Sequence, residues 1–348
     1  MSERIDLSPG YSISRVIRGG WQLSASHSGR VSSDPVEDMI AFADAGITTF
    51  DCADIYTGVE ELIGAFRRRY RDLRGAEALA RIRVHTKFVP DLDMLASIDK
   101  AYVARIIDRS LQRLGLERLD LVQFHWWDYR QPRWLETSLW LDELRRAGKI
   151  ENVGGTNFDT AHVLAMLDAG VQLSTMQVQL SLLDRRPERS LAKLADARGV
   201  SLLCYGTVAG GFLGERWLGQ PEPAPPLENR SLVKYKLIIE DFGGWELFQQ
   251  LLRTLASVAS RHGTDIASIA SAWSLERPGV AAVIVGARNR SHLASNLAIM
   301  SVQLRSEDHA EIEAVLACSR PLEGDVYSLE REITGRHGSI MKYNLNTG

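Results

Sequence analysis

Four side chains at the ends of predicted buried strands could together deliver a proton to a substrate. They are Asp51, Tyr56, Lys87 and His125. A phenol can act as a general acid, and an ammonium group beside it lowers its pKa. A carboxylate can hold that ammonium group in place, and an imidazole can hydrogen-bond the reacting oxygen. Together these residue types have the chemistry needed to reduce a carbonyl group.

Short apolar segments alternate with segments of helical spacing along the chain. The predicted strands are Arg15 to Trp21, Thr48 to Asp51, Ile82 to Lys87, Leu119 to His125, Ile150 to Asn157, Thr175 to Leu180, Val200 to Tyr205 and Ala281 to Val285. The predicted helices are Pro35 to Ala45, Glu60 to Tyr70, Asp99 to Leu114, Trp134 to Gly148, Thr160 to Ala169 and Pro187 to Arg198, with extra helices at Trp245 to His262 and Asp265 to Leu275. Eight such units joined by right-handed crossovers predict an α/β fold, the closed (β/α)8 TIM barrel.

Other segments are expected to add to this barrel. A hairpin is predicted around Pro9–Gly10, before the first strand. A long loop between Leu213 and Trp245 follows the seventh strand, and no single regular element is predicted there. Long loops on the active-site face are usually functional. We expect residues 1–348 to form one domain, whose polar tail (320–348) either returns over the active-site face or is partly disordered.

The positions of the four candidate residues place them on one rim. In a barrel of this kind the C-terminal strand ends carry the chemistry. Asp51, Lys87 and His125 end the second, third and fourth predicted strands, so they should be neighbours. Tyr56 is close enough to Asp51 for a short loop to fold it back over the rim. His85 alternates to the same face as Lys87, and we expect it to fill a layer of the barrel interior.

Composition and charge exclude several classes of protein. The chain has 348 residues and a formal net charge of -3, which gives no reason to expect a nucleic-acid or membrane partner. No stretch reaches the ~18 apolar residues that a membrane span needs. The three cysteines, Cys52, Cys204 and Cys318, share no metal or redox spacing. We therefore expect a reduced, cytoplasmic protein.

Several segments resemble, in the same order, the motifs of the aldo-keto reductase superfamily over nearly the whole chain. They are Asp51 to Tyr56 for the family's Asp-x-Ala-x-x-Tyr, Thr86–Lys87 for its Thr-Lys strand end, Asp120 to Trp126 for its histidine segment, Gly154 to Phe158 for its Gly-x-Ser-Asn-Phe, Gln177 to Arg185, and Val283 to Arg288 with Asn296–Leu297. Thr156 replaces the family's serine but keeps the hydroxyl group. His292 and Ser295 stand where the family commonly has Gln and Glu.

The resemblance implies reversible, metal-free, NADPH-dependent reduction of aldehydes or ketones to alcohols. Tyr56 would be the general acid, Lys87 would lower its pKa, and Asp51 would pair with Lys87. His125 would orient the carbonyl oxygen. The implied cofactor-binding residues are Gly20, Trp21, Asp51, Thr156, Asn157, Gln177, Tyr205, Gly206, Val208, Leu213, Gly286, Arg288, His292 and Asn296. The implied substrate-binding residues are Trp21, Tyr56, His125, Trp126 and Trp127. Arg288 indicates NADP over NAD, because a guanidinium group binds phosphate bidentately.

Two other functions remain as alternatives. Metal-dependent barrel hydrolases also gather His and Asp at strand ends, but they typically have two histidines on strand one. Here that strand ends Arg18-Gly19-Gly20-Trp21, without a ligand. Some members of the superfamily, such as potassium-channel β subunits, serve as cofactor-sensing regulatory subunits with little turnover. The carbonyl substrate, the physiological direction and the oligomeric state stay open.

Overall fold

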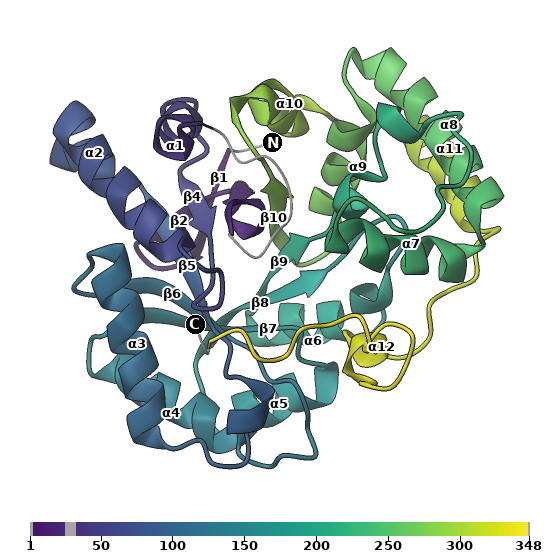
Figure 1. The fold of residues 1–348 in the computed structure, drawn as a ribbon. Coiled ribbons are helices and arrows are strands. Elements are labelled where there is room, and N and C mark those ends of the chain that lie inside the picture. Colours follow the sequence, from purple (N-terminus) through teal and green to yellow (C-terminus); the bar gives the residue numbers. More distant parts are fainter. Residues whose placement is uncertain (1–2, 25–32, 347–348) are drawn as a thin grey trace.

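Eight parallel strands close into a barrel in the computed structural model, which describes residues 3–24 and 33–346 (Figure 1). The strand order around the barrel is β10-β3-β4-β5-β6-β7-β8-β9. The strands are β3 (Val16–Gly19), β4 (Thr49–Asp51), β5 (Arg83–Phe88), β6 (Leu119–Phe124), β7 (Ile150–Thr156), β8 (Leu173–Gln179), β9 (Ser201–Tyr205) and β10 (Val280–Gly286). The predicted (β/α)8 TIM barrel is confirmed.

The predicted N-terminal hairpin closes one end of this barrel. It consists of β1 (Arg4–Ser8) and β2 (Tyr11–Ser14), which pair antiparallel across a turn at Gly10. Tyr11 is fully buried and packs with apolar side chains from the barrel interior. Its hydroxyl group lies 3.1 Å from Nε2 of His85, so His85 fills the interior as expected. The hairpin therefore leaves the opposite, C-terminal end of the barrel for a site.

Helices surround the barrel, and most begin where the sequence predicts. They are α1 (Pro35–Asp44), α2 (Val59–Leu79), α3 (Lys100–Leu114), α4 (Trp134–Arg146), α5 (Thr160–Asp168), α6 (Leu191–Arg198), α8 (Trp245–His262), α9 (Ile266–Leu275), α10 (Leu293–Ser301) and α11 (Ser306–Leu316). Several starts are set by N-cap side chains that accept the backbone N–H three residues on, namely Asp34, Asp99, Asp159 and Asp265. In the part of the chain that the structure describes, no helix has the length and apolarity needed to cross a membrane.

The long connection after β9 differs from the sequence-based expectation. It contains a 13-residue helix, α7 (Arg230–Phe242), where no regular element was predicted. Asn229 caps this helix by accepting the N–H of Leu232. Leu232, Tyr235 and Ile239 are buried at helical spacing, so one face of α7 packs against the molecule. This pattern was present in the sequence and was obscured by the Pro-rich and Gly-rich segments on either side.

The close contact between α2 and α3 gives a test of the fold. A Cβ atom at Gly64 of α2 would lie 2.5 Å from the backbone oxygen of Arg113 in α3. We expect Gly64→Ala to lower the free energy of unfolding by about 1–3 kcal/mol through this overpacking. Helix propensity alone would instead favour Ala by ~1 kcal/mol. Urea unfolding decides the sign, with Ala65→Gly as the control that reports propensity at the neighbouring position. A Gly64→Ala protein more stable than the wild type would contradict the packing.

Candidate active site

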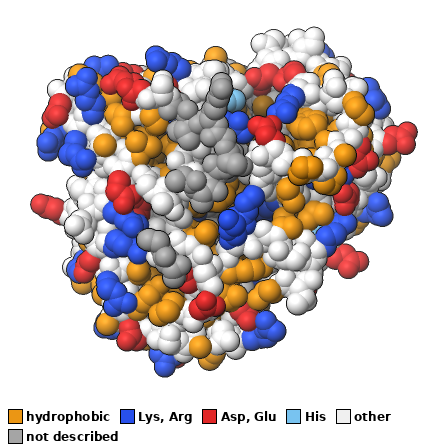
Figure 2. Space-filling view, viewed as in Figure 1, with side chains coloured by type: hydrophobic (Ala, Val, Ile, Leu, Met, Phe, Trp, Pro, Cys, Tyr) orange, Lys and Arg blue, Asp and Glu red, His pale blue; other side chains and the backbone are white. Residues whose placement is uncertain are grey.

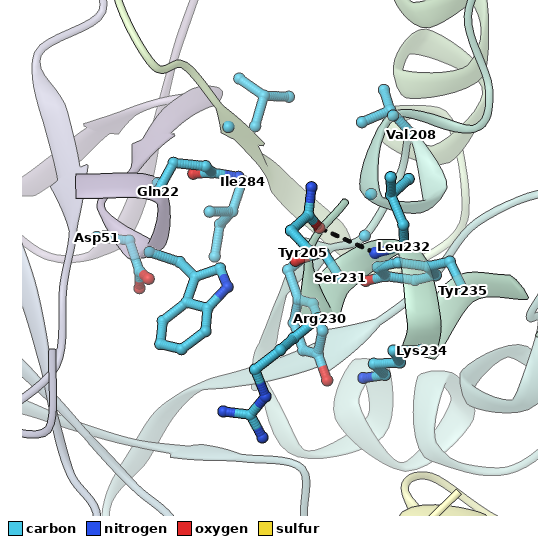
Figure 3. Close-up of a pocket in the computed structure, with 18 of the residues that line it drawn as sticks. Gln22, Asp51, Tyr205, Val208, Arg230, Ser231, Leu232, Lys234, Tyr235 and Ile284 are labelled. Atoms are coloured by element: carbon cyan, nitrogen blue, oxygen red, sulfur yellow. Dashed lines mark hydrogen bonds between the residues drawn. The ribbon is translucent and has the colours of Figure 1, made fainter. Parts of the chain in front are cut away.

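A cavity of about 820 Å³ opens at the C-terminal ends of the barrel strands. Asp51, Tyr56, Lys87 and His125 all line it, so the structure brings the four predicted residues together. Figure 3 shows part of this cavity, with Asp51 on one side and Tyr205 and Tyr235 on the other. Asp51 and Tyr56 come from the end of β4 and the loop after it, Lys87 from β5 and His125 from the end of β6, which the register of a parallel barrel places side by side.

A buried ion pair lies at the base of the cavity. The ammonium group of Lys87 is 2.5 Å from Oδ1 of Asp51 and also donates to the backbone oxygen of Cys52 at 2.8 Å. Oδ2 of Asp51 accepts from Nε2 of Gln177 at 2.7 Å and from Nε2 of Gln123 at 3.0 Å. Burial lowers the pKa of Lys87, but the charge and hydrogen bond of Asp51, together with the smaller effects of Tyr56 and Cys52, outweigh burial and leave that pKa raised. Lys87 is therefore a fixed cation at neutral pH.

Tyr56 is held against this cation by a short loop between β4 and α2. Its amide donates to the backbone oxygen of Ala53, and its ring packs on Trp21 at 5.1 Å between centroids. The ammonium of Lys87 lies 5.2 Å from the centre of the Tyr56 ring. Burial raises the pKa of Tyr56, while Lys87 acts in the opposite direction. The sequence-based prediction that Lys87 lowers the pKa of Tyr56 is wrong for the net shift, because burial has the larger effect. The phenol is therefore protonated at neutral pH.

His125 follows β6 and is fixed by rings and by one hydrogen bond. Its Nδ1 lies 3.1 Å from the backbone oxygen of Thr156. The ring meets Trp127 at 4.3 Å and 90°, and Tyr327 at 5.6 Å and 87°. Burial lowers the pKa of His125 to about 3, and the cation of Arg331 adds to this effect. Its Nε2 is buried and has no hydrogen-bond partner in the described structure.

Most of the predicted cofactor-binding residues line the same cavity. Those that do are Trp21, Asp51, Thr156, Asn157, Gln177, Tyr205, Gly206, Val208, Leu213, Gly286, Arg288, His292 and Asn296. Gly20 was also predicted to bind the cofactor, but it does not line the cavity. Its amide donates to the backbone oxygen of Asp51, and a Cβ atom there would lie 2.7 Å from that oxygen. Gly20 thus serves close packing beneath the site.

Trp126 was predicted to contact the substrate, but the structure places it away from the cavity. It is fully buried and does not line the cavity. Its indole N–H donates to the backbone oxygens of Asp128 and Gln131, which places the ring behind the β6 loop. The next residue, Trp127, does line the cavity, and its indole N–H donates to the backbone oxygen of Pro90. Two adjacent tryptophans therefore have different roles, one in the core and one in the cavity wall.

The lining of the cavity includes a group of glycines and an unpaired donor that could hold a dinucleotide. Gly210, Gly211 and Gly214 line it, so the backbone there is open to close approach. Nδ2 of Asn296 is buried in this region without a hydrogen-bond partner. Arg288 also lines the cavity, but it lies 3.6 Å from Glu228, which forms a second ion pair with Arg216 at 3.0 Å. Arg288, the residue predicted to bind the phosphate, is thus already paired with a carboxylate.

Helix α7 contributes side chains that the sequence analysis missed. Arg230, Lys234 and Tyr235 line the cavity, on the side opposite Asp51 (Figure 3). The ammonium group of Lys234 lies 5.3 Å from the ring centre of Tyr205 and 5.6 Å from that of Tyr235. Figure 2 shows basic side chains at the centre of this face, with hydrophobic ones beside them. These residues could have been found only by first recognising α7.

The C-terminal tail runs back across the barrel, as Figure 1 shows for its yellow segment, and contributes to the wall of the cavity. It contains the short helix α12 (Ser328–Arg331), and Tyr327 adopts a left-handed conformation with φ 60°. The tail residues that line the cavity are Tyr327, Ile340, Met341, Lys342 and Leu345. Arg331 donates to the backbone oxygens of Trp126, Trp127 and Asn157, so the tail is tied to the loops that carry the site.

A buried ionic cluster anchors α12. Glu330 is 1% exposed and accepts from both terminal nitrogens of Arg186, at 3.2 Å. Arg186 also binds Asp184 at 2.7 Å, and Lys234 of α7 lies 3.7 Å from Glu330. Burial raises the pKa of Glu330, but Arg186 and Lys234 outweigh it and lower the value to about 2. The cluster joins the loop after β8, α7 and the tail.

The comparisons with known proteins agree with the fold. The family model "Aldo/keto reductase family" matches residues 15–317, and the chain belongs to this family. It is 26% identical over 315 residues to the aldo-keto reductase YhdN of Bacillus subtilis, covering 88% of this chain and 91% of that one. It is 27% identical over 261 residues to flagellar radial spoke protein 5 of Chlamydomonas reinhardtii, covering 64% of this chain and only 49% of that one.

The solved structure of glycerol dehydrogenase AKR11B4 from Gluconobacter oxydans has the same fold. It aligns with a TM-score of 0.74 and 23% identity, covering 90% of this chain and 94% of that one. Within residues 3–24 and 33–346, no group of three or more His, Cys, Asp or Glu side chains is arranged to hold a metal ion.

The ionic cluster predicts how the tail responds to acid. Because the pKa of Glu330 is lowered from 4.5 to about 2 on folding, its contribution is present above pH 4.5 and is lost as the pH falls toward 2. Glu330→Gln should cost about 3–5 kcal/mol of unfolding free energy at neutral pH, since it leaves buried cations uncompensated. The wild-type advantage over this variant should shrink across that pH range. Denaturant titration and limited proteolysis of the tail measure both effects.

The exposed tail residue Glu323 offers the matched control for this test. Glu323→Gln should leave both the stability and the proteolysis pattern unchanged. A Glu330→Gln protein with wild-type stability and a protected tail would show that the cluster does not anchor α12.

Proposed function

We propose that this protein catalyses the reversible NADPH-dependent reduction of an aldehyde or ketone to an alcohol, with Tyr56 as the general acid. The observation that carries the proposal is the ammonium group of Lys87, held by Asp51 and facing the ring of Tyr56 at the base of the cavity. A fixed cation there stabilises the phenolate that forms when the phenol gives up its proton. This is the chemistry that the family membership leads one to expect.

The proposed proton step needs only residues of this chain. The hydroxyl group of Tyr56 donates its proton to the carbonyl oxygen as that oxygen becomes negative. Lys87 compensates the charge left on the tyrosine. Asp51 keeps the ammonium in place and has its own second oxygen held by Gln123 and Gln177, so the pair does not need to reorganise during the reaction.

A nicotinamide dinucleotide would supply the hydride, and the residues of the cavity fit such a group. The hydroxyl group of Tyr205 donates to Oδ1 of Asn157, which orients the tyrosine ring at the cavity wall. We propose that a nicotinamide ring stacks there, with Thr156, Asn157 and Gln177 at its carboxamide. The unpaired Nδ2 of Asn296 and the guanidinium of Arg288 would meet the adenosine end, including the 2′-phosphate of NADP.

The assignment of the acid predicts the outcome of two substitutions. Tyr56→Phe should lower kcat for carbonyl reduction by about 10²–10⁴-fold while NADPH binding stays nearly intact, because only the proton donor is lost. Lys87→Met should lower kcat similarly, since the phenol loses the cation that stabilises its conjugate base and Asp51 is left unpaired. NADPH absorbance reports turnover and tryptophan fluorescence reports binding. Tyr102→Phe and Lys193→Met, which remove the same groups outside the cavity, should behave as the wild type. Wild-type turnover by Tyr56→Phe would show that another group is the acid.

The ion pair at the adenosine end predicts cofactor choice. NADPH should bind more tightly than NADH, and Arg288→Ala should weaken NADPH binding by roughly ten- to a hundredfold while hardly changing NADH binding. Glu228→Gln should strengthen NADPH binding a few-fold, because it removes the carboxylate that competes for Arg288 and Arg216. Both cofactors can be titrated by tryptophan fluorescence quenching.

Arg290 is the matched control for cofactor choice, since it is exposed and pairs with Asp38 rather than facing the cavity. Arg290→Ala should leave both affinities unchanged. Equal affinities of the wild type for the two cofactors, or an unchanged ratio in Arg288→Ala, would rule out Arg288 as the residue that selects the 2′-phosphate.

A further inference from the structure

The cations that line the cavity differ in whether a carboxylate neutralises them. Those within ion-pair distance of an acidic side chain are Lys87, Arg216, Lys234 and Arg288. Within residues 3–24 and 33–346, Arg230 and Lys342 also line the cavity but have no acidic side chain at that distance. Lys342 is exposed to water, whereas Arg230 is half-buried. Arg230 is therefore the cation of the cavity whose charge most needs a partner.

The guanidinium group of Arg230 is largely free to meet a ligand. Arg230 is the first residue of α7, and one terminal nitrogen donates to the backbone oxygen of Ile340 in the tail at 2.9 Å. Its side chain makes no other hydrogen bond within the described part of the chain. Figure 3 shows this side chain extending from α7 into the cavity, away from Val208. Most of its N–H donors are thus left for a bound molecule.

The surroundings of Arg230 favour a negative group beside it. Burial lowers the pKa of Arg230, which means that the surrounding protein disfavours its charge. One turn further along α7, Lys234 carries a charge of the same sign and also lines the cavity. A carboxylate matches a guanidinium group especially well, because its two oxygens accept two parallel N–H donors.

The tail segment that Arg230 contacts lies against the catalytic end of the cavity. Ile340 begins this segment, and Tyr343 within it packs on Trp127 at 5.1 Å between ring centroids. Trp127 in turn meets the ring of His125 at 4.3 Å. The wall here is mainly aromatic and apolar, so one cation in it can fix the orientation of a ligand.

We propose that Arg230 binds an anionic group of the substrate, so that the preferred substrates are aldehydes or ketones that carry a carboxylate at the end away from the reacting carbonyl. This rests on the proposed carbonyl reduction and names a substrate class for it. The carbonyl oxygen meets the hydroxyl group of Tyr56, and the carboxylate forms paired hydrogen bonds with the guanidinium group. Aromatic walls such as Trp127 contact the apolar part that joins the two groups.

Matched substrates and three variants test this inference. We compare 4-carboxybenzaldehyde with 4-formylbenzamide, and succinic semialdehyde with its methyl ester, because each pair replaces the carboxylate by a neutral group. Arg230→Gln removes the charge, and Arg230→Lys keeps it. Arg320→Gln is the control, since Arg320 is exposed, lies outside the cavity and likewise donates to one backbone oxygen, that of Glu240. Intrinsic carbonyl reactivity cancels when the anionic-to-neutral ratio of kcat/KM is compared between enzymes.

We expect this ratio to fall by roughly tenfold or more in Arg230→Gln, to be partly retained in Arg230→Lys and to stay at the wild-type value in Arg320→Gln. Loss of the contact with Ile340 would affect both members of a substrate pair, so it does not move the ratio. In the wild type the ratio should also fall between about 0.05 and 0.5 M NaCl, because salt screens the charges. In Arg230→Gln it should hardly depend on salt.

Calorimetric titration of the NADP complex with benzoate gives a measurement without turnover. Benzoate should bind more tightly to the wild type than to Arg230→Gln, while benzamide should bind both alike. The same ratio of kcat/KM and the same benzoate affinity in wild type and Arg230→Gln would overturn the inference and leave carbonyl reduction intact. Weaker NADPH binding by Arg230→Gln with an unchanged ratio would overturn it by assigning the arginine to the cofactor. No turnover of any carbonyl by the wild type would overturn the proposed function, and this substrate class with it.

Discussion

The burial of one ammonium group is the constraint on which the rest of this structure depends. An unpaired charge inside a protein is costly, and Lys87 is tolerated because Asp51 lies 2.5 Å from it. Asp51 is in turn held by Gln123 and Gln177, so side chains from β4, β5, β6 and β8 meet at a single carboxylate. The charge is thereby fixed to the barrel itself. A neighbouring phenol held by a short loop then faces a cation that does not need to move.

The site is completed by two segments that lie outside the eight β/α units. Helix α7 and the C-terminal tail are joined through Glu330, whose charge compensates Arg186 and Lys234. The adjacent Arg331 hydrogen-bonds to the backbone at the ends of the β6 and β7 loops. Burial lowers the pKa of His125, and the charge of the same arginine adds to this effect. The C-terminal tail therefore does more than enclose the cavity, because Arg331 also helps to keep His125 neutral.

The strand-end residues could be predicted because the register of a parallel barrel is simple. Once Asp51, Lys87 and His125 are assigned to consecutive strands, their neighbourhood follows without knowledge of side-chain packing. Trp126 and Trp127 show where this reasoning fails. Strand β6 ends at Phe124, so the alternation of side chains no longer applies to them, and only tertiary packing decides that one is core and the other is cavity wall.

Other features depended on contacts between segments far apart in sequence. The position of Lys234 required α7 to be recognised, and the ion pair of Arg288 with Glu228 joins two loops that no local pattern relates. The pKa of Tyr56 was misjudged for a similar reason. Sequence identifies the cation beside it, but the extent of burial that raises the pKa comes from Trp21 and the surrounding walls.

A crystal structure of the protein with bound NADP would test the proposed site most directly. We expect the nicotinamide ring to stack on Tyr205, with its C4 atom facing a space that also lies within about 3–3.5 Å of the Tyr56 hydroxyl group. The ammonium group of Lys87 should stay between Asp51 and Tyr56. A nicotinamide bound away from Tyr205, or a Tyr56 hydroxyl group turned away from Lys87 in that complex, would contradict the proposed site.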